Sequence, residues 1–361
     1  MTTMTYPPSD ARRVIGGVDT HKDIHVGAVL DENGRLLDTG SFPTTVAGYR
    51  HLWRWMCGHG DVVAVGIEGT GAWGAGLSRY LTAQGADVRE VMRPNRQHRR
   101  RYGKSDEADA IGAARAVLAG EAVGTPKSQT GTVEAIRLLR IARRSAMKAR
   151  TQAGNQIHAV IDTAPEGLRR RFVGRPIVDI VAEVAQFRRR HLPDTPFEAA
   201  RLTLRTLGRR WQDLDDEITM LDDHLDATAP TLRAINGVGA QVATALLAAA
   251  GDNPERLRSS SSFAALCGVS PIDASSGRQQ HHRLNRYGDR HANWALHVVI
   301  ISRLRWHAPT KAYMARRLAQ GRTKKMIIRC LKRHVIREIH RAITTDLDHR
   351  PEHDRASRIA A

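Results

Sequence analysis

VIGGVDTHKD at residues 14–23 and DVVAVGIE at residues 61–68 are the stretches that decide the fold. Each contains a short apolar run that ends in a carboxylate, Asp19 in the first stretch and Glu68 in the second. A short apolar run bounded by turn signals is typical of a buried strand. We therefore expect two buried strands, each with an acidic side chain at its tip.

The residues around these strands alternate between strand and helix patterns. A second strand is predicted at 24–30, and Asn33-Gly34 forms a hairpin turn into a third strand at 35–42. The chain continues with a helix at 45–57, the strand at 61–68, a helix at 74–85, a strand at 86–92 and a helix at 106–120. This order is typical of an RNase H-like α/β domain with a mixed sheet.

Two more acidic residues open the last of these helices. Asp106 and Asp109 in KSDEADA are three residues apart, so both side chains point to one face. With Asp19 and Glu68 they make four carboxylates, which repel one another unless a divalent cation lies between them. We predict a metal site for phosphodiester chemistry, of the kind that holds two cations about 4 Å apart. The alternative is that the acids are helix caps and surface charges.

Another class of protein shares this strand order. Actin-like ATPases and sugar kinases carry a G-x-D motif that GVDTH (17–21) resembles, and GIEGTGAWG (66–74) resembles a phosphate loop. Those proteins require a second copy of the fold with its own nucleotide-binding loop. The remaining sequence leaves no room for that copy, so we discount this class.

The composition indicates a nucleic-acid partner. The 361 residues include 56 Lys and Arg against 37 Asp and Glu, a formal charge of +19. An excess of this size favours nucleic acid over membrane, although a ribosome-associated or merely basic protein has the same composition. The three cysteines lack CxxC spacing, and the sequence shows neither a membrane span nor a signal peptide. A cytoplasmic protein without a zinc site or a disulfide framework is expected.

Four regions follow from these patterns. Residues 12–125 form the α/β domain, 126–229 a charged helical segment, 230–345 a mostly helical basic domain, and 346–361 a polar tail. In the second region a heptad spacing joins Leu207, Trp211, Leu214, Ile218, Leu221 and Leu225. This seam predicts an antiparallel coiled coil or dimerisation arm, with an ordinary helical linker as the alternative.

Three segments are predicted to contact nucleic acid. The basic loop 89–104 leads into the Asp pair, Gly237-Val238-Gly239 resembles a helix-hairpin-helix, and the tripeptide SSG at 275–277 is followed by further arginines. A serine flanked by guanidinium groups could attack phosphorus beside a metal, although an SSG tripeptide is most often a plain loop. The candidate contacts are Arg96, Arg99, Arg100, Arg101, Gly237, Gly239, Arg278, Arg283 and Arg286.

These motifs, in this order, resemble those of the DEDD-type insertion-sequence transposases, whose studied members are bridge-RNA-guided recombinases. The resemblance covers nearly the whole chain and rests on GVDTHKD, GIEGTG, KSDEADA, INGVGAQVATALLAAAGD, CGVSPIDASSG, HRLNRYGDRHANWALH and GRTKKMIIRCLKRHVIREI. It implies a RuvC-like N-terminal domain, a coiled coil and a C-terminal transposase domain with a catalytic serine. The family's serine precedes a glycine a few residues after a proline, which selects Ser276 over Ser275.

The resemblance also implies a mechanism and partners. Asp19, Glu68, Asp106 and Asp109 would bind Mg²⁺, with Mn²⁺ as a substitute, and Ser276 would attack a DNA phosphate to form a phosphoserine linkage before strands are exchanged and rejoined. A structured non-coding RNA would select donor and target DNA, and homodimers would assemble into homotetramers on a bacterial nucleoid. Two alternatives remain: a metal-dependent endonuclease of the Holliday-junction-resolving kind, and a protein that bridges nucleic acids without cutting.

Overall fold

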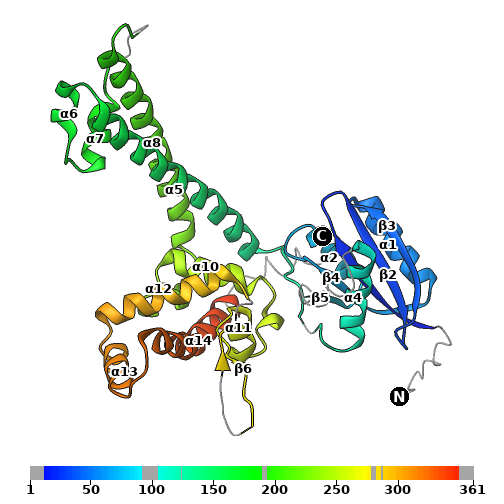
Figure 1. Ribbon diagram of the computed structural model, residues 1–361. Helices are drawn as coiled ribbons and strands as arrows, with labels where there is room; N and C mark the ends of the chain where they lie inside the picture. Colours follow the sequence, from blue (N-terminus) through cyan, green and yellow to red (C-terminus); the bar gives the residue numbers. More distant parts are fainter. Residues whose placement is uncertain are drawn as a thin grey trace. The chain divides into compact units, whose positions relative to one another are not determined.

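The computed structural model describes residues 12–91, 105–122, 124–188, 193–277, 282–285 and 288–348 (Figure 1). The chain forms two compact units. The first comprises Met1–Thr132, Ala250–Phe263 and Leu347–Ala361, and the second comprises Val133–Ala249 and Ala264–Asp346. A stretch from the second half of the sequence therefore belongs to the N-terminal unit.

The first unit is built on a five-stranded sheet with the order β3-β2-β1-β4-β5. The β1–β2 and β2–β3 pairs are antiparallel, whereas β1–β4 and β4–β5 are parallel. The strands are β1 (Arg13–Thr20), β2 (Ile24–Asp31), β3 (Leu36–Pro43), β4 (Asp61–Glu68) and β5 (Val88–Val91). The predicted mixed α/β sheet is confirmed, and it is consistent with an RNase H-like domain.

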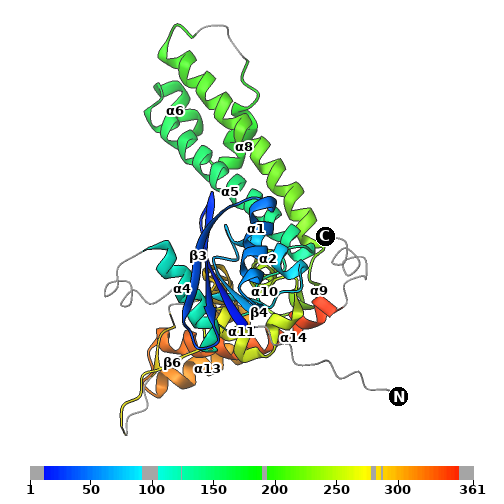
Figure 2. The ribbon, with the colours of Figure 1, turned by 90° about the vertical axis from the view of Figure 1, so that its right-hand side faces the viewer.

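Helices cover both faces of this sheet. They are α1 (Val46–Gly58), α2 (Ala75–Ala83) and α4 (Asp106–Leu118), and the unit also contains the short 3₁₀ helix η1 (Pro254–Leu257). Figure 2 shows α1 and α2 on one face and α4 on the other. Because side chains alternate between faces along a strand, Val14 and Val18 join the core under α1 and α2, while Ile15 packs against Ala114 of α4.

Gly17 marks a close approach of β1 to α4. A methyl group in place of its hydrogen would lie 2.2 Å from the carbonyl oxygen of Ala110 and 2.4 Å from the amide nitrogen of Ala114. Both are helix backbone atoms, which cannot move without displacing α4. We expect Gly17→Ala to lower the free energy of unfolding by about 3 kcal/mol, as measured by urea denaturation.

The matched control is Gly112→Ala within α4, where an added methyl group meets nothing within 4 Å. Alanine is favoured over glycine in a helix interior by up to about 1 kcal/mol, so this change should be neutral or slightly stabilising. Equal losses from the two substitutions would contradict this account of the packing.

Two long antiparallel helices form the arm of the second unit, and they are α5 (Thr132–Thr163) and α8 (Pro196–Asp226) (Figure 1). Ion pairs join Arg143 to Asp222 and Arg150 to Asp215, as expected for two helices that run in opposite directions. The Arg150 guanidinium also lies 5.2 Å from the ring centroid of Trp211. All six residues of the predicted heptad spacing are buried or half-buried.

Two short helices that were not predicted lie where α5 ends, and they are α6 (Glu166–Phe172) and α7 (Ile177–Val184). Pro165 and Pro176 are the N-cap residues of these helices, where the missing amide of proline removes no hydrogen bond of the helix. Their apolar side chains share one buried cluster with the long helices, formed by Ile157, Ile161, Leu168, Phe172, Ile180, Val181, Val184 and Leu204.

Within the described residues, the regular elements in the rest of the second unit are helices and the two-stranded ladder of β6 (Ile272–Asp273) and β7 (His282–Arg283). The remaining helices are α9 (Pro230–Arg233), α10 (Ala240–Ala250), α11 (Ser260–Leu266), α12 (Arg290–Trp306), α13 (Ala308–Ala319) and α14 (Lys324–Asp348), of which α10, α11 and α14 reach into the first unit's ranges. The predicted helical C-terminal region is confirmed. None of the helices in the described part of the chain is both long and apolar enough to cross a membrane.

Candidate active site

Strand alternation places two of the four acids on the side of the sheet that α4 covers. On β1, Asp19 lies two residues after Gly17, which faces α4. On β4, Glu68 lies two residues after Gly66, where an added methyl group would be 2.7 Å from the carbonyl oxygen of Ala113 in α4. Since β1 and β4 are adjacent and parallel, their acidic ends lie side by side at one edge of the sheet.

The other two acids lie in the first turn of α4. The Ser105 hydroxyl caps this helix by accepting a hydrogen bond from the amide of Ala108 (3.1 Å). Asp106 and Asp109 follow directly, where negative charge is favoured by the helix dipole. Asp109 is buried, whereas Asp106 is exposed.

His21 connects the tips of β1 and α4. Its Nε2 atom lies 3.1 Å from Oδ2 of Asp19 and 3.2 Å from Oδ1 of Asp106. One ligand atom from each of these three residues lies within 4.8 Å of the other two, a spacing at which a single cation can be held. Among the described residues, Glu68 and Asp109 are not part of this group.

Asp19 occupies an unfavourable position for a carboxylate without a cation. Its side chain is almost fully buried, and burial raises its pKa. Attraction to His21 and a hydrogen bond from it act in the opposite direction, while repulsion by Asp109 and Asp106 raises the pKa further. A divalent cation would offset the burial and the repulsion together, so the residues present fit such an ion.

His21 was not among the predicted site residues. It lies two residues after Asp19 and directly follows Thr20, the last residue of β1, so an alternation that continues one residue past the strand would put it on the same face as Asp19. That spacing is the signal that could have identified it. Imidazole nitrogen is a common ligand of transition metals, so His21 widens the range of cations that the cluster can accept.

The loop after Glu68 is braced by buried polar groups. Thr70 is 2% exposed and donates to Oε1 of Glu90 (2.8 Å), while Oε2 of Glu90 accepts from the Arg256 guanidinium (3.3 Å). Arg256 also donates to the carbonyl oxygen of Thr125 (2.8 Å). The returning segment Ala250–Phe263 thereby supports the loop that follows the Glu68 carboxylate.

Both halves of the chain match transposase family models. The model of DEDD transposases of the IS110 type, described as a transposase, matches residues 16–164, and one described as the transposase IS116/IS110/IS902 family matches residues 229–315. The chain belongs to the IS110 family of transposases. No match was found among curated proteins. The predicted DEDD-type transposase, an enzyme that acts on DNA, is confirmed, and its acidic cluster indicates the use of a divalent metal.

In this IS110 transposase the two candidate serines lie in the loop after β6. The Ser275 hydroxyl donates to Oδ1 of Asp273 (2.5 Å), and this bond holds the pKa of Asp273 below its usual value. Ser276 is exposed and precedes Gly277, whose φ of +56° lies in the left-handed region that favours glycine. The role of Ser276 as the nucleophile stays a prediction.

Most of the predicted nucleic-acid contacts of the transposase lie outside the described residues, and these are Arg96, Arg99, Arg100, Arg101, Arg278 and Arg286. Arg283 is exposed on β7. Gly237 has a φ of +84°, and a methyl group there would lie 3.1 Å from the carbonyl oxygen of Val299, so packing alone accounts for this glycine. Gly239 has open space around it. Phosphate contact by either glycine stays a prediction.

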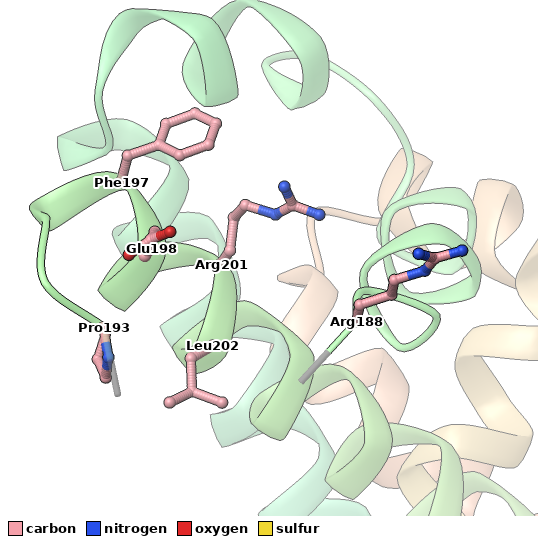
Figure 3. Close-up of a pocket in the computed structure, with 6 residues that line it drawn as sticks. All are labelled: Arg188, Pro193, Phe197, Glu198, Arg201 and Leu202. Carbon is pink, nitrogen blue, oxygen red and sulfur yellow. The ribbon is translucent and has the colours of Figure 1, made fainter. Parts of the chain in front are cut away.

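Figure 3 shows a cavity in the second unit that is lined by Arg188, Pro193, Phe197, Glu198, Arg201 and Leu202. The Arg201 guanidinium lies 6.0 Å from the ring centroid of Phe197 and 4.6 Å from that of Phe187. The cavity volume is about 80 Å³, well below the roughly 300 Å³ at which small-molecule sites begin. We assign no ligand to it.

His25 is a buried histidine on the face of the sheet opposite to the acids. Its ring stacks on Tyr49 with a centroid distance of 5.7 Å, and neither ring nitrogen has a hydrogen-bond partner in the described structure. Burial lowers its pKa, and the charge of His21 lowers it further. The unfolded chain therefore binds a proton at this position more readily than the folded chain does.

We expect His25 to make the transposase less stable in mild acid. Above the ordinary pKa of 6.5 the imidazole is neutral in the folded and the unfolded chain, and it costs no stability. As the pH falls below that value the unfolded chain takes up the proton first, so the free energy of unfolding falls by at most about 1.4 kcal/mol per pH unit. His25→Phe keeps an aromatic ring that can stack on Tyr49 and removes the proton site, so the free energy of unfolding of the variant should fall less between about pH 7.5 and pH 5.5. The same pH dependence in both proteins would contradict this assignment.

Proposed function

We propose that this transposase is a DNA recombinase that cleaves, exchanges and rejoins strands through a phosphoserine intermediate, with Mg²⁺ at the acidic cluster. The observation that carries the proposal is the convergence of Asp19 and Asp106 on His21 in a chain of the IS110 family. Glu68 and Asp109 lie on the same side of the sheet and would complete the ligand set. Mn²⁺ would substitute, because it also prefers carboxylate oxygen.

When bound, the cation would stabilise charge that develops on the phosphate and on the attacking and leaving oxygens. The Oγ atom of Ser276 attacks phosphorus, gives up its proton to a base and forms an O–P bond as the bond to the DNA 3′ oxygen breaks. That 3′ oxygen takes up a proton. A 3′-hydroxyl from another strand then attacks the phosphoserine, which restores the serine and joins the DNA without net hydrolysis.

The proposal includes nucleic-acid and protein partners. A formal charge of +19 suits donor DNA, target DNA and a structured guide RNA bound together on the nucleoid. On α5, Leu138 is 53% exposed and Ile141 is 45% exposed, three residues apart on one face. This apolar strip suits a coiled-coil contact with a second copy, so we propose homodimers that pair into homotetramers.

The test combines full-length protein, donor and target DNA, the RNA encoded beside the gene, and Mg²⁺. We expect a protein–DNA adduct that survives a denaturing gel, joined strands confirmed by sequencing, and neither product when EDTA is added. Cut DNA with free ends and no adduct would refute the phosphoserine step. Tight binding without cutting or joining would refute the recombinase altogether.

The second candidate is a RuvC-like, metal-dependent, structure-specific endonuclease in which water attacks the phosphate. It is favoured by the fact that Asp19, His21 and Asp106 converge within the first unit alone. Cleavage of branched DNA by a protein that never forms an adduct would support this candidate over the recombinase.

A further inference from the structure

A hollow of about 460 Å³ adjoins the acidic cluster at the end of β1. Its wall includes His21, Lys22, Asp23, Ile24, Trp73 and Asp106. His21 and Asp106 belong to the acidic cluster as well. The hollow is therefore directly continuous with the place where a scissile phosphate would be engaged.

The wall presents apolar surface next to these charged groups. Trp73 is 55% exposed and Ile24 is 50% exposed. The ring centroid of Trp73 lies 6.5 Å from that of His21, whose Nε2 contacts both Asp19 and Asp106. An indole buries a large apolar area when it stacks on a flat ring, and here it forms exposed apolar surface together with Ile24 directly beside His21 and Asp106.

The turn that carries Trp73 is held by hydrogen bonds. The carbonyl oxygen of Gly69 accepts from the amides of Ala72 (2.9 Å) and Gly74 (3.2 Å), and Gly69 has a φ of +75°. Thr70 in the same turn donates to Glu90. The indole is therefore presented from an ordered turn, which lowers the entropy cost of binding a flat ligand.

We propose that Trp73 stacks on an unpaired base of the DNA, beside the phosphate that the acidic cluster engages. A π-face binds any base, but only where the base is not stacked inside a duplex. Lys22 in the same wall supplies positive charge for the DNA backbone. The distance from Trp73 to His21 is one that a single nucleotide spans from base to phosphate.

This inference rests on the proposed function for the position of the phosphate. It adds a substrate class, which is DNA that carries at least one unpaired nucleotide at the cleavage position. Fully paired DNA would have to be opened there before it could be cut, and the indole would stabilise the opened base.

The experiment measures binding without cleavage, with Ca²⁺ in place of Mg²⁺. The probes are a DNA duplex that contains a short unpaired stretch with 2-aminopurine and a fully paired duplex of equal length. Trp73→Ala should weaken binding of the unpaired probe about tenfold or more, abolish the quenching of 2-aminopurine and leave the paired duplex unaffected. Trp73→Phe should retain most of the affinity and most of the quenching.

The matched control is Trp306→Ala, which removes an 81% exposed indole at the end of α12 and should change nothing. The proposal is overturned if Trp73→Ala weakens the paired duplex equally, if both alanine variants lose affinity equally, or if only an RNA of the same sequence depends on Trp73. The assay measures binding alone, so it can be read even for a protein that forms no covalent adduct with DNA. Failure of this inference and failure of the proposed function are therefore separate outcomes.

Discussion

Asp19→Asn should reduce the rate of DNA strand cleavage about a thousandfold or more. The substitution preserves the size of the side chain and removes a buried charge that lies against His21 and near Asp106. A bound cation contributes several kcal/mol of transition-state stabilisation, and each 1.4 kcal/mol or so is a factor of ten in rate. The measurement is the single-turnover rate on labelled DNA at saturating Mg²⁺.

Thermal unfolding provides a second readout for the same variant. Burial and the neighbouring acids disfavour the charged form of Asp19, so a neutral amide should leave the melting temperature unchanged or slightly higher. The control is Glu107→Gln, an exposed residue in the same first turn of α4, which should cleave at nearly the wild-type rate. Cleavage by Asp19→Asn at more than roughly a tenth of the wild-type rate would exclude Asp19 as a ligand of the catalytic metal.

Ser276→Ala should abolish the covalent adduct and lower strand joining by at least about a thousandfold, because it removes the attacking oxygen. The variant should still bind DNA, since the acidic cluster and the basic side chains are unchanged. Mass spectrometry of the digested wild-type adduct should place the nucleotide on the peptide that contains Ser276.

Ser275→Ala is the matched control. It removes a hydroxyl that is bonded to Asp273 in the same exposed loop, and joining should remain within about threefold of wild type. The opposite pattern, with the adduct lost only in Ser275→Ala, would move the nucleophile by one residue. An adduct that persists in both variants would remove the serine mechanism.

The strands and helices of the first unit were predictable because each depends on residues close together in the chain. The runs that end at Asp19 and Glu68 form β1 and β4, as expected. The Asn33-Gly34 pair joins β2 to β3, and Gly34 has the positive φ of +80° that such a hairpin turn needs. The start of α4 at Asp106 was predictable for the same reason, because its signals, the Ser105 cap and the acidic first turn, are adjacent in the sequence.

Other features were not predictable from local pattern. Helices α6 and α7 have only 7 and 8 residues, too few turns for a clear periodic signal. Arg256 contacts Glu90 across 166 positions of sequence, and nothing near either residue indicates the other. That contact exists because Ala250–Phe263 folds back onto the first unit.

The sequence by itself determined the order of the four acids, the mixed sheet and the transposase family, because the residues of a motif and the periodicity of apolar positions are properties of the chain alone. Only the tertiary structure decided that Asp19 and Asp106 meet at His21 and that Trp73 is exposed beside them. The alternation of side chains along a strand can assign a residue to one face of the sheet, but the distance between two side chains depends on how closely their two elements pack. Here that distance is set by the close approach of α4 to β1, which is possible because Gly17 has no side chain.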